Sequence, residues 1–142
     1  MLNPSKRRRI AMSGLLVIGA TTLAGCAGGV TVNDDSSVAI VTDAGFLTGD
    51  EALVQGTVSI TEGGCVGITD SQGDTYPTVW PTGTRLVHGS DSAIEIPGLG
   101  VRQLGDEVSG SGGYYAVTTR PVLDDVADRC GWDGDVIGVR FE

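Results

Sequence analysis

The clearest pattern in the chain is an alternation of apolar and polar residues between Ala52 and Thr61. Apolar residues or glycine occupy the even positions of this run and polar residues occupy most of the odd ones, with Leu53 as the exception. A period of two is typical of a strand that buries one face and exposes the other. Gly56 lies inside the run, where a glycine indicates a bend or a bulge. The pattern therefore predicts a long, bent strand.

A hairpin is expected directly after this strand. Glu62-Gly63-Gly64 has the composition of a tight turn, because glycine accepts the positive φ that hairpin turns need. The partner strand is expected over residues 65–69, and it ends at the turn formed by residues 70–74.

Further short strands, separated by turn residues, are predicted along the rest of the chain. They are expected over residues 75–80, 84–88, 93–96, 107–109, 114–119 and 136–141, and a first edge strand is expected over 38–43. Pro77 lacks a backbone N–H, so the 75–80 strand is expected at a sheet edge. Gly110-Ser111-Gly112-Gly113 is interpreted as a hairpin loop.

Residues 121–130 break the strand pattern. Apolar residues at positions 122, 123, 126, 127 and 130 form a stripe with helical spacing. Pro121 suits the first helical turn, acidic residues follow at the positive end of the helix dipole, and Gly131 stands at its end. A short helix is therefore predicted near the C-terminus.

Many short strands with a single late helix predict an all-β domain, built as a small antiparallel barrel over residues 38–142. The order of a long first strand with a glycine bend, a tight hairpin, further strands and a late helix resembles OB-like barrels. This resemblance implies a fold and no particular activity.

The N-terminus has a different pattern, in which a basic segment precedes an apolar one. Lys6 and the arginines at positions 7–9 are followed by apolar and small residues from Ile10 to Leu23. This is the layout of a secretory signal peptide, and the apolar run is shorter than the roughly 20 residues of a comfortable membrane span. We expect a signal-peptide helix over about residues 8–24. The alternative is an uncleaved anchor helix, oriented by its positive charges.

The segment Leu23-Ala24-Gly25-Cys26 resembles the lipobox of bacterial lipoproteins at every position. The resemblance implies a signal peptide over residues 1–25, diacylglycerol on the Cys26 thiol, and a location on the outer face of the cytoplasmic membrane. It leaves open whether the freed amine also carries an acyl group such as palmitate. Two or three acyl chains would hold the protein firmly on the membrane, whereas a single acyl chain binds only marginally.

A flexible linker is expected to follow the lipidated cysteine, so that residues 26–37 join the membrane to the barrel. Residues 27–37 are small, polar and acidic, and they cannot bury enough area to offset the entropy lost on ordering. As a coil, this segment would reach roughly 18 Å.

Charge limits the partners of the mature chain. The full sequence has nine basic and eighteen acidic residues, and the four cations at positions 6–9 leave with the signal peptide. Five arginines then remain against eighteen acidic residues, a formal charge of −13. A surface this acidic repels phosphate backbones, so nucleic acid is not expected as a partner.

Two cysteines remain once Cys26 is lipidated. Cys65 and Cys130 would lie in an oxidising compartment, where a disulfide is the expected outcome. It would join the predicted hairpin to the end of the predicted helix. The alternative is a reactive thiol near His88, but the chain has no CxxC motif.

No catalytic constellation is visible in the sequence. His88 is the only histidine, and no serine lies in a G-x-S-x-G elbow. We expect His88 at a strand end, facing solvent or capping a turn. The aspartates near the predicted helix form either a solvated acidic rim or a calcium site, although the EF-hand spacing is missing; they are Asp124, Asp125, Asp128, Asp133 and Asp135. No cofactor is expected.

Four aromatic residues are candidates for a binding surface: Trp80, Tyr114, Tyr115 and Trp132. Each could stack on a ligand, although in a small barrel a tryptophan more often fills the interior. Tyr114 and Tyr115 point to opposite faces of their strand, so one of the two is expected to be exposed.

Three short motifs, Gly64-Cys65, Val79-Trp80-Pro81-Thr82-Gly83 and Gly105-Asp106-Glu107-Val108, resemble small uncharacterised actinobacterial lipoproteins. The resemblance implies no activity. We expect a lipid-anchored binding or interaction module, not an enzyme, whose ligand is an unknown envelope protein or a small molecule. The alternatives are a small envelope hydrolase using carboxylates or His88, and a structural accessory subunit of an envelope complex.

Replacing Cys26 by serine removes the thiol that the lipid would occupy. We expect the Cys26→Ser protein to leave the membrane fraction and to lack fatty acid by mass spectrometry. Retention in the membrane through the uncleaved N-terminal segment would contradict the lipidation hypothesis.

Overall fold

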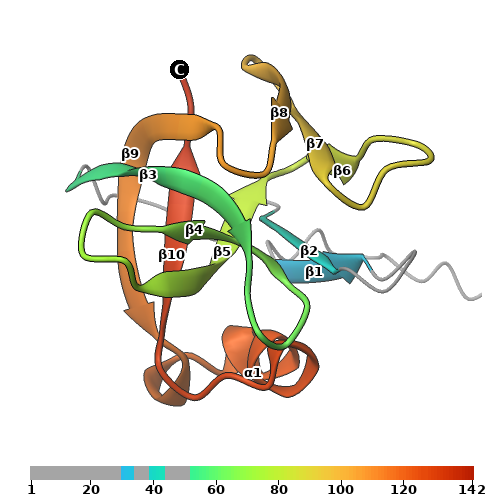
Figure 1. Ribbon diagram of the computed structural model, residues 1–142. Helices are drawn as coiled ribbons and strands as arrows, with labels where there is room; N and C mark the ends of the chain where they lie inside the picture. The colour runs from blue at the N-terminus through green and yellow to red at the C-terminus, as the bar shows by residue number, and fades with distance from the viewer. Residues whose placement is uncertain (1–29, 34–38, 44–51) are drawn as a thin grey trace, which may run out of the picture.

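The computed structural model of the chain describes residues 30–33, 39–43 and 52–142 (Figure 1). Strands dominate this part, and a short helix lies near the C-terminus, as the sequence predicts. The expected signal-peptide helix, Cys26 and most of the expected linker lie outside the described residues. Within the described residues, no helix has the length and hydropathy needed to span a membrane.

The elements follow one another along the described chain as ten strands and a C-terminal helical segment. The strands are β1 (Val30–Asn33), β2 (Ile40–Asp43), β3 (Ala52–Ile60), β4 (Val66–Thr69), β5 (Thr75–Pro81), β6 (Arg85–Leu86), β7 (Ala93–Ile96), β8 (Gly100–Gln103), β9 (Glu107–Ala116) and β10 (Asp135–Arg140). Two 3-10 turns, Val117–Thr119 and Pro121–Leu123, precede helix α1 (Asp124–Cys130).

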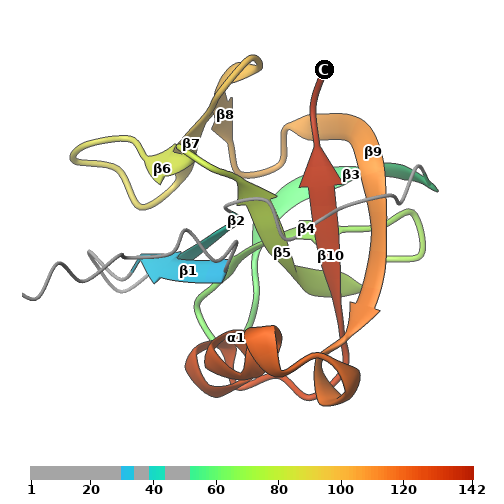
Figure 2. The ribbon, with the colours of Figure 1, turned by 180° about the vertical axis from the view of Figure 1, so that it is seen from behind.

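Five strands close a barrel in the order β3-β4-β5-β10-β9, with β9 pairing back to β3. The third and fifth strands of the barrel, β5 and β10, lie side by side, which is the connectivity of an OB-like barrel. These two strands run parallel, whereas the other barrel pairs are antiparallel as predicted. Strand β9 ends beside the start of β10, where Ala116 pairs with Asp135, and the helical segment connects the two strands at that end of the barrel (Figure 2). Strand β10 therefore runs antiparallel to β9 and parallel to β5.

Two apolar cores lie on opposite sides of β5. Trp80 faces the barrel interior, where it packs in one cluster with Ile137 of β10. Val79 faces outward and packs in a second cluster with Val126 of α1. Because successive residues of a strand point to opposite faces, β5 can be buried on both sides. This explains why its second half is apolar without a clean alternation.

Helix α1 has the predicted place and the predicted buried stripe. Val126 and Cys130 are buried, and Pro121 begins the preceding 3-10 turn. Gly131 ends the helix in the left-handed conformation, with φ of 58°, and its N–H donates to the carbonyl of Ala127. This end is the αL cap that glycine provides.

A disulfide joins Cys65, immediately before β4, to Cys130, at the end of α1, as predicted. The Arg129 guanidinium also donates to the Gly63 carbonyl at 3.1 Å, so the β3–β4 turn and the helix end are held at two adjacent points. The two cysteines are 65 residues apart. Closing a loop of that length stabilises the fold by about 4 kcal/mol in the chain-entropy model.

Strand β2 lies within the predicted first strand, but it is not at an edge. It pairs with β1 on one side and, in parallel, with the second half of β5 on the other. Its edge position in the prediction is therefore wrong. Strand β1 falls within residues expected to form the linker, so part of that segment is a strand close to Cys26 in sequence.

The edge position predicted from Pro77 is also wrong, because β5 has neighbours on both sides. On one side β4 pairs with its first half, and on the other side β10 pairs with it from Thr78. Pro77 thus lies one residue before the β10 ladder begins, a place where the missing N–H is tolerated.

The hairpin loop predicted at residues 110–113 is wrong, since β9 runs without a break through these residues. Gly112 pairs with Ala52 on β3 and with Val139 on β10. A Cβ at position 112 would collide with the Gly138 carbonyl. The glycines therefore allow close approach of strands in the barrel wall. The predicted 114–119 strand ends earlier, because a 3-10 turn begins at Val117.

Strands β6, β7 and β8 form a separate three-stranded sheet between β5 and β9, which projects from the barrel (Figure 1). The sequence predicts a strand at each of the first two, although β6 is shorter than expected. It gives no signal for β8, because Gly100-Val101-Arg102-Gln103 is too short and too polar to show a strand pattern.

We expect Gly112→Ala to lower the free energy of unfolding by about 1–3 kcal/mol, since the added methyl must displace the β10 backbone. Ser109→Ala, on an exposed part of the same strand, is the matched control and should change it by less than about 0.5 kcal/mol. Urea denaturation of both variants measures the difference. An equally small effect of Gly112→Ala would favour a loop at this position.

Candidate functional site

Three aromatic side chains meet at one end of the barrel: Tyr76 of β5, Tyr114 of β9 and Trp132, which follows α1. The ring centroids of Tyr76 and Tyr114 are 5.4 Å apart with an interplanar angle of 83°, and those of Tyr76 and Trp132 are 6.2 Å apart at 73°. Both contacts are edge-to-face, an arrangement that aromatic rings favour. Tyr114 is 51% exposed, so this aromatic cluster reaches the surface.

Strand register explains why the two tyrosines meet. Tyr114 on β9 and Thr78 on β5 are both paired with Ile137, which lies on β10 between them. Tyr76 is two residues before Thr78 and therefore points to the same face of β5. The inner face of the wall thus carries both phenol rings to the end of the barrel, where the apolar filling stops.

Trp132 is held against this end by its own turn. Its indole Nε1 donates to the Asp135 carbonyl at 2.8 Å, and its ring lies against Gly134. The ring also packs on the cluster of apolar residues beneath α1. These contacts hold the indole in one orientation, so the aromatic cluster is formed before any ligand arrives.

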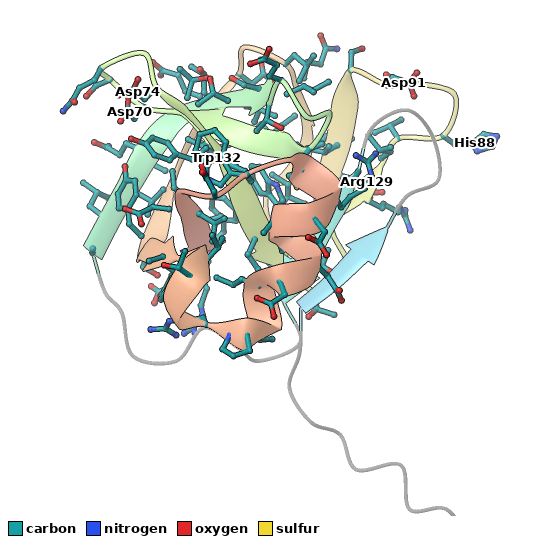
Figure 3. The ribbon with its side chains drawn as sticks, turned by 90° about the horizontal axis from the view of Figure 1, so that it is seen from below. Asp70, Asp74, His88, Asp91, Arg129 and Trp132 are labelled. Atoms are coloured by element: carbon teal, nitrogen blue, oxygen red, sulfur yellow. A yellow bond between two sulfur atoms is a disulfide. The ribbon has the colours of Figure 1, made fainter. Side chains whose placement is uncertain are left out.

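Three carboxylates lie close enough to the aromatic cluster for their charges to act on Tyr76. Asp70 and Asp74 belong to the β4–β5 turn, and Asp135 is the first residue of β10. The Asp70 Oδ1 accepts the backbone N–H groups of Gln72 and Asp74 at 2.8 and 3.0 Å, which fixes that carboxylate. Figure 3 shows Asp70 and Asp74 on the side of the barrel where Trp132 lies, away from His88 and Asp91.

The negative charges act on the tyrosines. Burial raises the pKa of Tyr76, and the charges of Asp70, Asp74 and Asp135 raise it further. Burial also raises the pKa of Tyr114, with a further contribution from Asp70. Both effects disfavour the phenolate. The two phenols therefore remain neutral hydrogen-bonding groups throughout the physiological pH range.

Of the four predicted binding residues, Tyr114 is exposed, Trp132 is half-buried and the other two are buried. Tyr114 and Trp132 belong to the aromatic cluster. Trp80 is fully buried, and its Nε1 donates to the Val66 carbonyl at 3.2 Å. Tyr115 is buried on the α1 side, where the Arg120 guanidinium lies 4.6 Å from its ring centroid. Trp80 and Tyr115 are therefore core residues and do not contribute to an exposed surface.

The sequence did not indicate Tyr76 as a site residue. It precedes Pro77, and the edge position assigned to that proline hid the fact that this strand lies in the barrel wall. The available signal was its spacing of two from Thr78 and four from Trp80, which places all three side chains on one face of β5.

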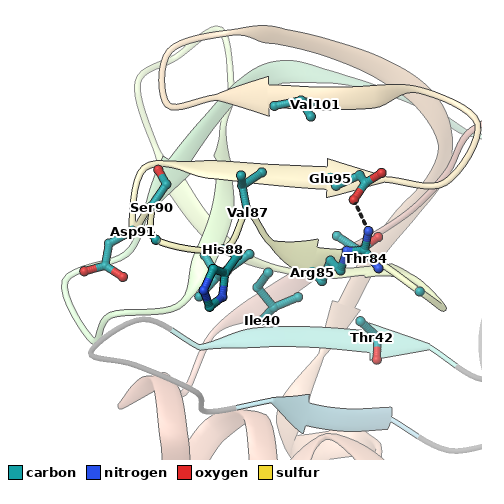
Figure 4. A pocket seen from close by; sticks show the side chains of 13 residues that line it. Ile40, Thr42, Thr84, Arg85, Val87, His88, Ser90, Asp91, Glu95 and Val101 are labelled. Carbon is teal, nitrogen blue, oxygen red and sulfur yellow. Dashed lines mark hydrogen bonds and ion pairs between the residues drawn. The ribbon is translucent and has the colours of Figure 1, made fainter.

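A groove of about 1080 Å³ lies on the other side of the molecule, between β2 and the three-stranded sheet (Figure 4). His88, Asp91 and the ion pair of Arg85 with Glu95 are among the residues that line it. Thr84 also lines the groove. Among the described side chains, its hydroxyl oxygen is the buried polar atom that has no hydrogen-bond partner. Within the described part of the chain, no hydrogen bond joins His88 to a nucleophile or to a carboxylate. The groove therefore has polar residues but no assembled catalytic pair.

The carboxylates considered for calcium do not gather into a site. No group of three or more histidine, cysteine or acidic side chains within residues 30–33, 39–43 and 52–142 is placed to hold a metal ion. Asp124, Asp125 and Asp128 are exposed on α1, while Asp133 and Asp135 follow its end. A solvated acidic rim describes this arrangement.

No protein-family model matches this chain, and neither does any curated protein or solved structure. The site must therefore be judged from its own chemistry. That chemistry consists of two neutral phenols, one indole and three carboxylates at an exposed barrel end.

The raised pKa values of Tyr76 and Tyr114 predict a loss of stability in alkali. In the unfolded chain these phenols titrate near 10.0, whereas the folded state keeps them protonated to higher pH. Their contribution is complete below that pH and is lost as the pH rises through the folded pKa. We expect the free energy of unfolding of the Tyr76→Phe/Tyr114→Phe variant to fall less steeply above pH ~10. Chemical denaturation at several pH values measures this, and parallel curves for the two proteins would contradict it.

Proposed function

We propose that this chain is a lipid-anchored binding module on the outer face of the bacterial cytoplasmic membrane. The lipobox resemblance at residues 23–26 supports the anchor. The Cys65–Cys130 disulfide supports an extracytoplasmic location, because disulfides persist in oxidising compartments. The ligand is an envelope component that binds at the aromatic cluster.

The observation that carries this proposal is the contact of the half-buried Tyr76 with the exposed Tyr114 and the half-buried Trp132. Tyrosine and tryptophan are enriched where proteins bind one another, since each combines a large apolar surface with a polar tip. Tyr114 lies half-exposed although the barrel interior is next to it. A ring kept at the surface beside two others provides contact area for a ligand.

A second candidate function is that of a structural accessory subunit in an envelope complex, and the groove favours it. Strand β6 lines the groove and, in the described part of the chain, pairs with β7 only. Its other edge carries backbone groups that an extended segment of a partner could pair with.

Site-specific photocrosslinking in intact cells tests which surface is used. A photoreactive amino acid in place of Tyr114 should give crosslinked products with an envelope component. The same amino acid in place of His88, in the groove on the other side, is the control and should give none. Products from position 88 alone would favour the accessory function, and the absence of products at both positions would contradict a binding module.

A further inference from the structure

The aromatic cluster and the carboxylates beside it attract the same kind of ligand. The faces of the phenol and indole rings carry negative partial charge, so they attract cations. Asp70, Asp74 and Asp135 add full negative charges next to Tyr76, and all the charges that shift the pKa of this phenol raise it. The carboxylates repel an anionic ligand, whereas an organic cation is attracted both by the rings and by the carboxylates.

We propose that the surface formed by Tyr76, Tyr114, Trp132, Asp70, Asp74 and Asp135 receives an arginine side chain from a basic segment of a partner protein. The inference rests on the proposed function, because it assumes that this surface is the binding site, and it names the ligand class. A formal charge of −13 on the mature chain would draw such a segment toward the domain.

Arginine fits this surface better than lysine. The guanidinium is planar, stacks on aromatic rings and forms paired hydrogen bonds with carboxylates, whereas the lysine ammonium is compact and strongly hydrated. The chain already contains an example of this contact, since the Arg120 guanidinium lies 4.6 Å from the centroid of the Tyr115 ring. The same pairing can form at Tyr114 with an arginine from outside.

The exposure of the site favours a protein segment over a small molecule. Small ligands bind in pockets that cover most of their surface. The aromatic cluster instead lies at an exposed barrel end, where Tyr114 alone is 51% accessible. A side chain that belongs to a larger partner can bind with less of its own surface buried, because the rest of the partner supplies further contacts.

The test uses the full-length chain in nonionic detergent and a peptide, Arg-Gly-Arg-Gly-Arg, with blocked ends. The control peptide replaces each arginine by citrulline, which has nearly the same shape and no charge. The readout is the indole N–H resonance of Trp132 by NMR, identified by its loss in Trp132→Phe. The buried indole of Trp80 reports in the same spectrum whether the fold is intact.

We expect the arginine peptide to shift the Trp132 resonance and the citrulline peptide to bind at least about tenfold more weakly. Raising the salt concentration from about 20 to about 200 mM should weaken binding, because it shortens the range of the charges.

Three variants assign the interaction to its parts. Tyr114→Ala should weaken binding of the arginine peptide by about threefold or more. The Asp70→Asn/Asp74→Asn/Asp135→Asn variant keeps an oxygen acceptor at position 70 for the turn and should reduce the preference for the arginine peptide over the citrulline peptide, leaving the part that the rings supply. His88→Ala, in the groove on the other side, should leave binding unchanged.

The outcomes separate this inference from the proposed function. Equal binding of the two peptides, binding that survives Tyr114→Ala, or no shift at Trp132 would each overturn the arginine proposal. If the peptides fail while N-acetylglucosamine oligomers shift Trp132, or while crosslinking at position 114 succeeds, the binding module stands with a different ligand. If all of these fail, both proposals are wrong.

Discussion

The position of β10 between β5 and β9 is the constraint on which the rest of the structure depends. Its antiparallel ladder to β9 and its parallel ladder to β5 close the barrel. The same two ladders bring Tyr76 and Tyr114 onto one face at one end, and Val136 and Val79 onto the other face beneath α1. A single strand register therefore determines the barrel core, the seat of the helix and the exposed aromatic rings.

Much of the fold could be predicted from the sequence, because local patterns there agree with the tertiary structure. The period-two alternation that ends at Thr61 predicted a strand, and the apolar stripe before Gly131 predicted a helix. The two cysteines that remain after lipidation predicted a disulfide. The failures occur where tertiary contacts override local preference. Gly112 suggests a loop from its local sequence, but it is needed in a strand because the Gly138 carbonyl leaves no room for a Cβ. Pro77 suggests a sheet edge, but it is tolerated inside the sheet because the β10 ladder begins only at Thr78.

The candidate site was predictable only in part, for the same reason. Whether an aromatic residue fills a core or lies at a surface depends on where the barrel ends, and alternation cannot locate that end. Tyr114 and Tyr115 were correctly expected on opposite faces, with one of them exposed. Trp80 and Tyr76 share a face of β5, yet one lies deep in the barrel and the other at its rim. That difference comes from barrel length and tilt, not from the sequence near either residue.

The site differs from the one that OB-like barrels commonly use. In those barrels, the outer face of the second and third strands binds oligonucleotides or sugars, helped by the loop after the first strand and the loop between the last two strands. Here the disulfide ties those two loops together. Helix α1 packs on the outer face of β5 at Val79, and β2 pairs with β5 at the same residue. The carboxylates beside the aromatic cluster are also opposite in charge to what a nucleic acid needs.

The early start of β1 has a consequence for how the domain meets its membrane. Val30 is already paired with Asp43, and only four residue steps separate it from Cys26. A fully extended chain covers at most about 14 Å in that distance. If Cys26 carries the lipid, the edge of the sheet must lie within about 14 Å of the lipid attachment point, and the domain cannot reorient freely relative to the membrane. The short connection would then fix which faces of this acidic domain look outward into the envelope.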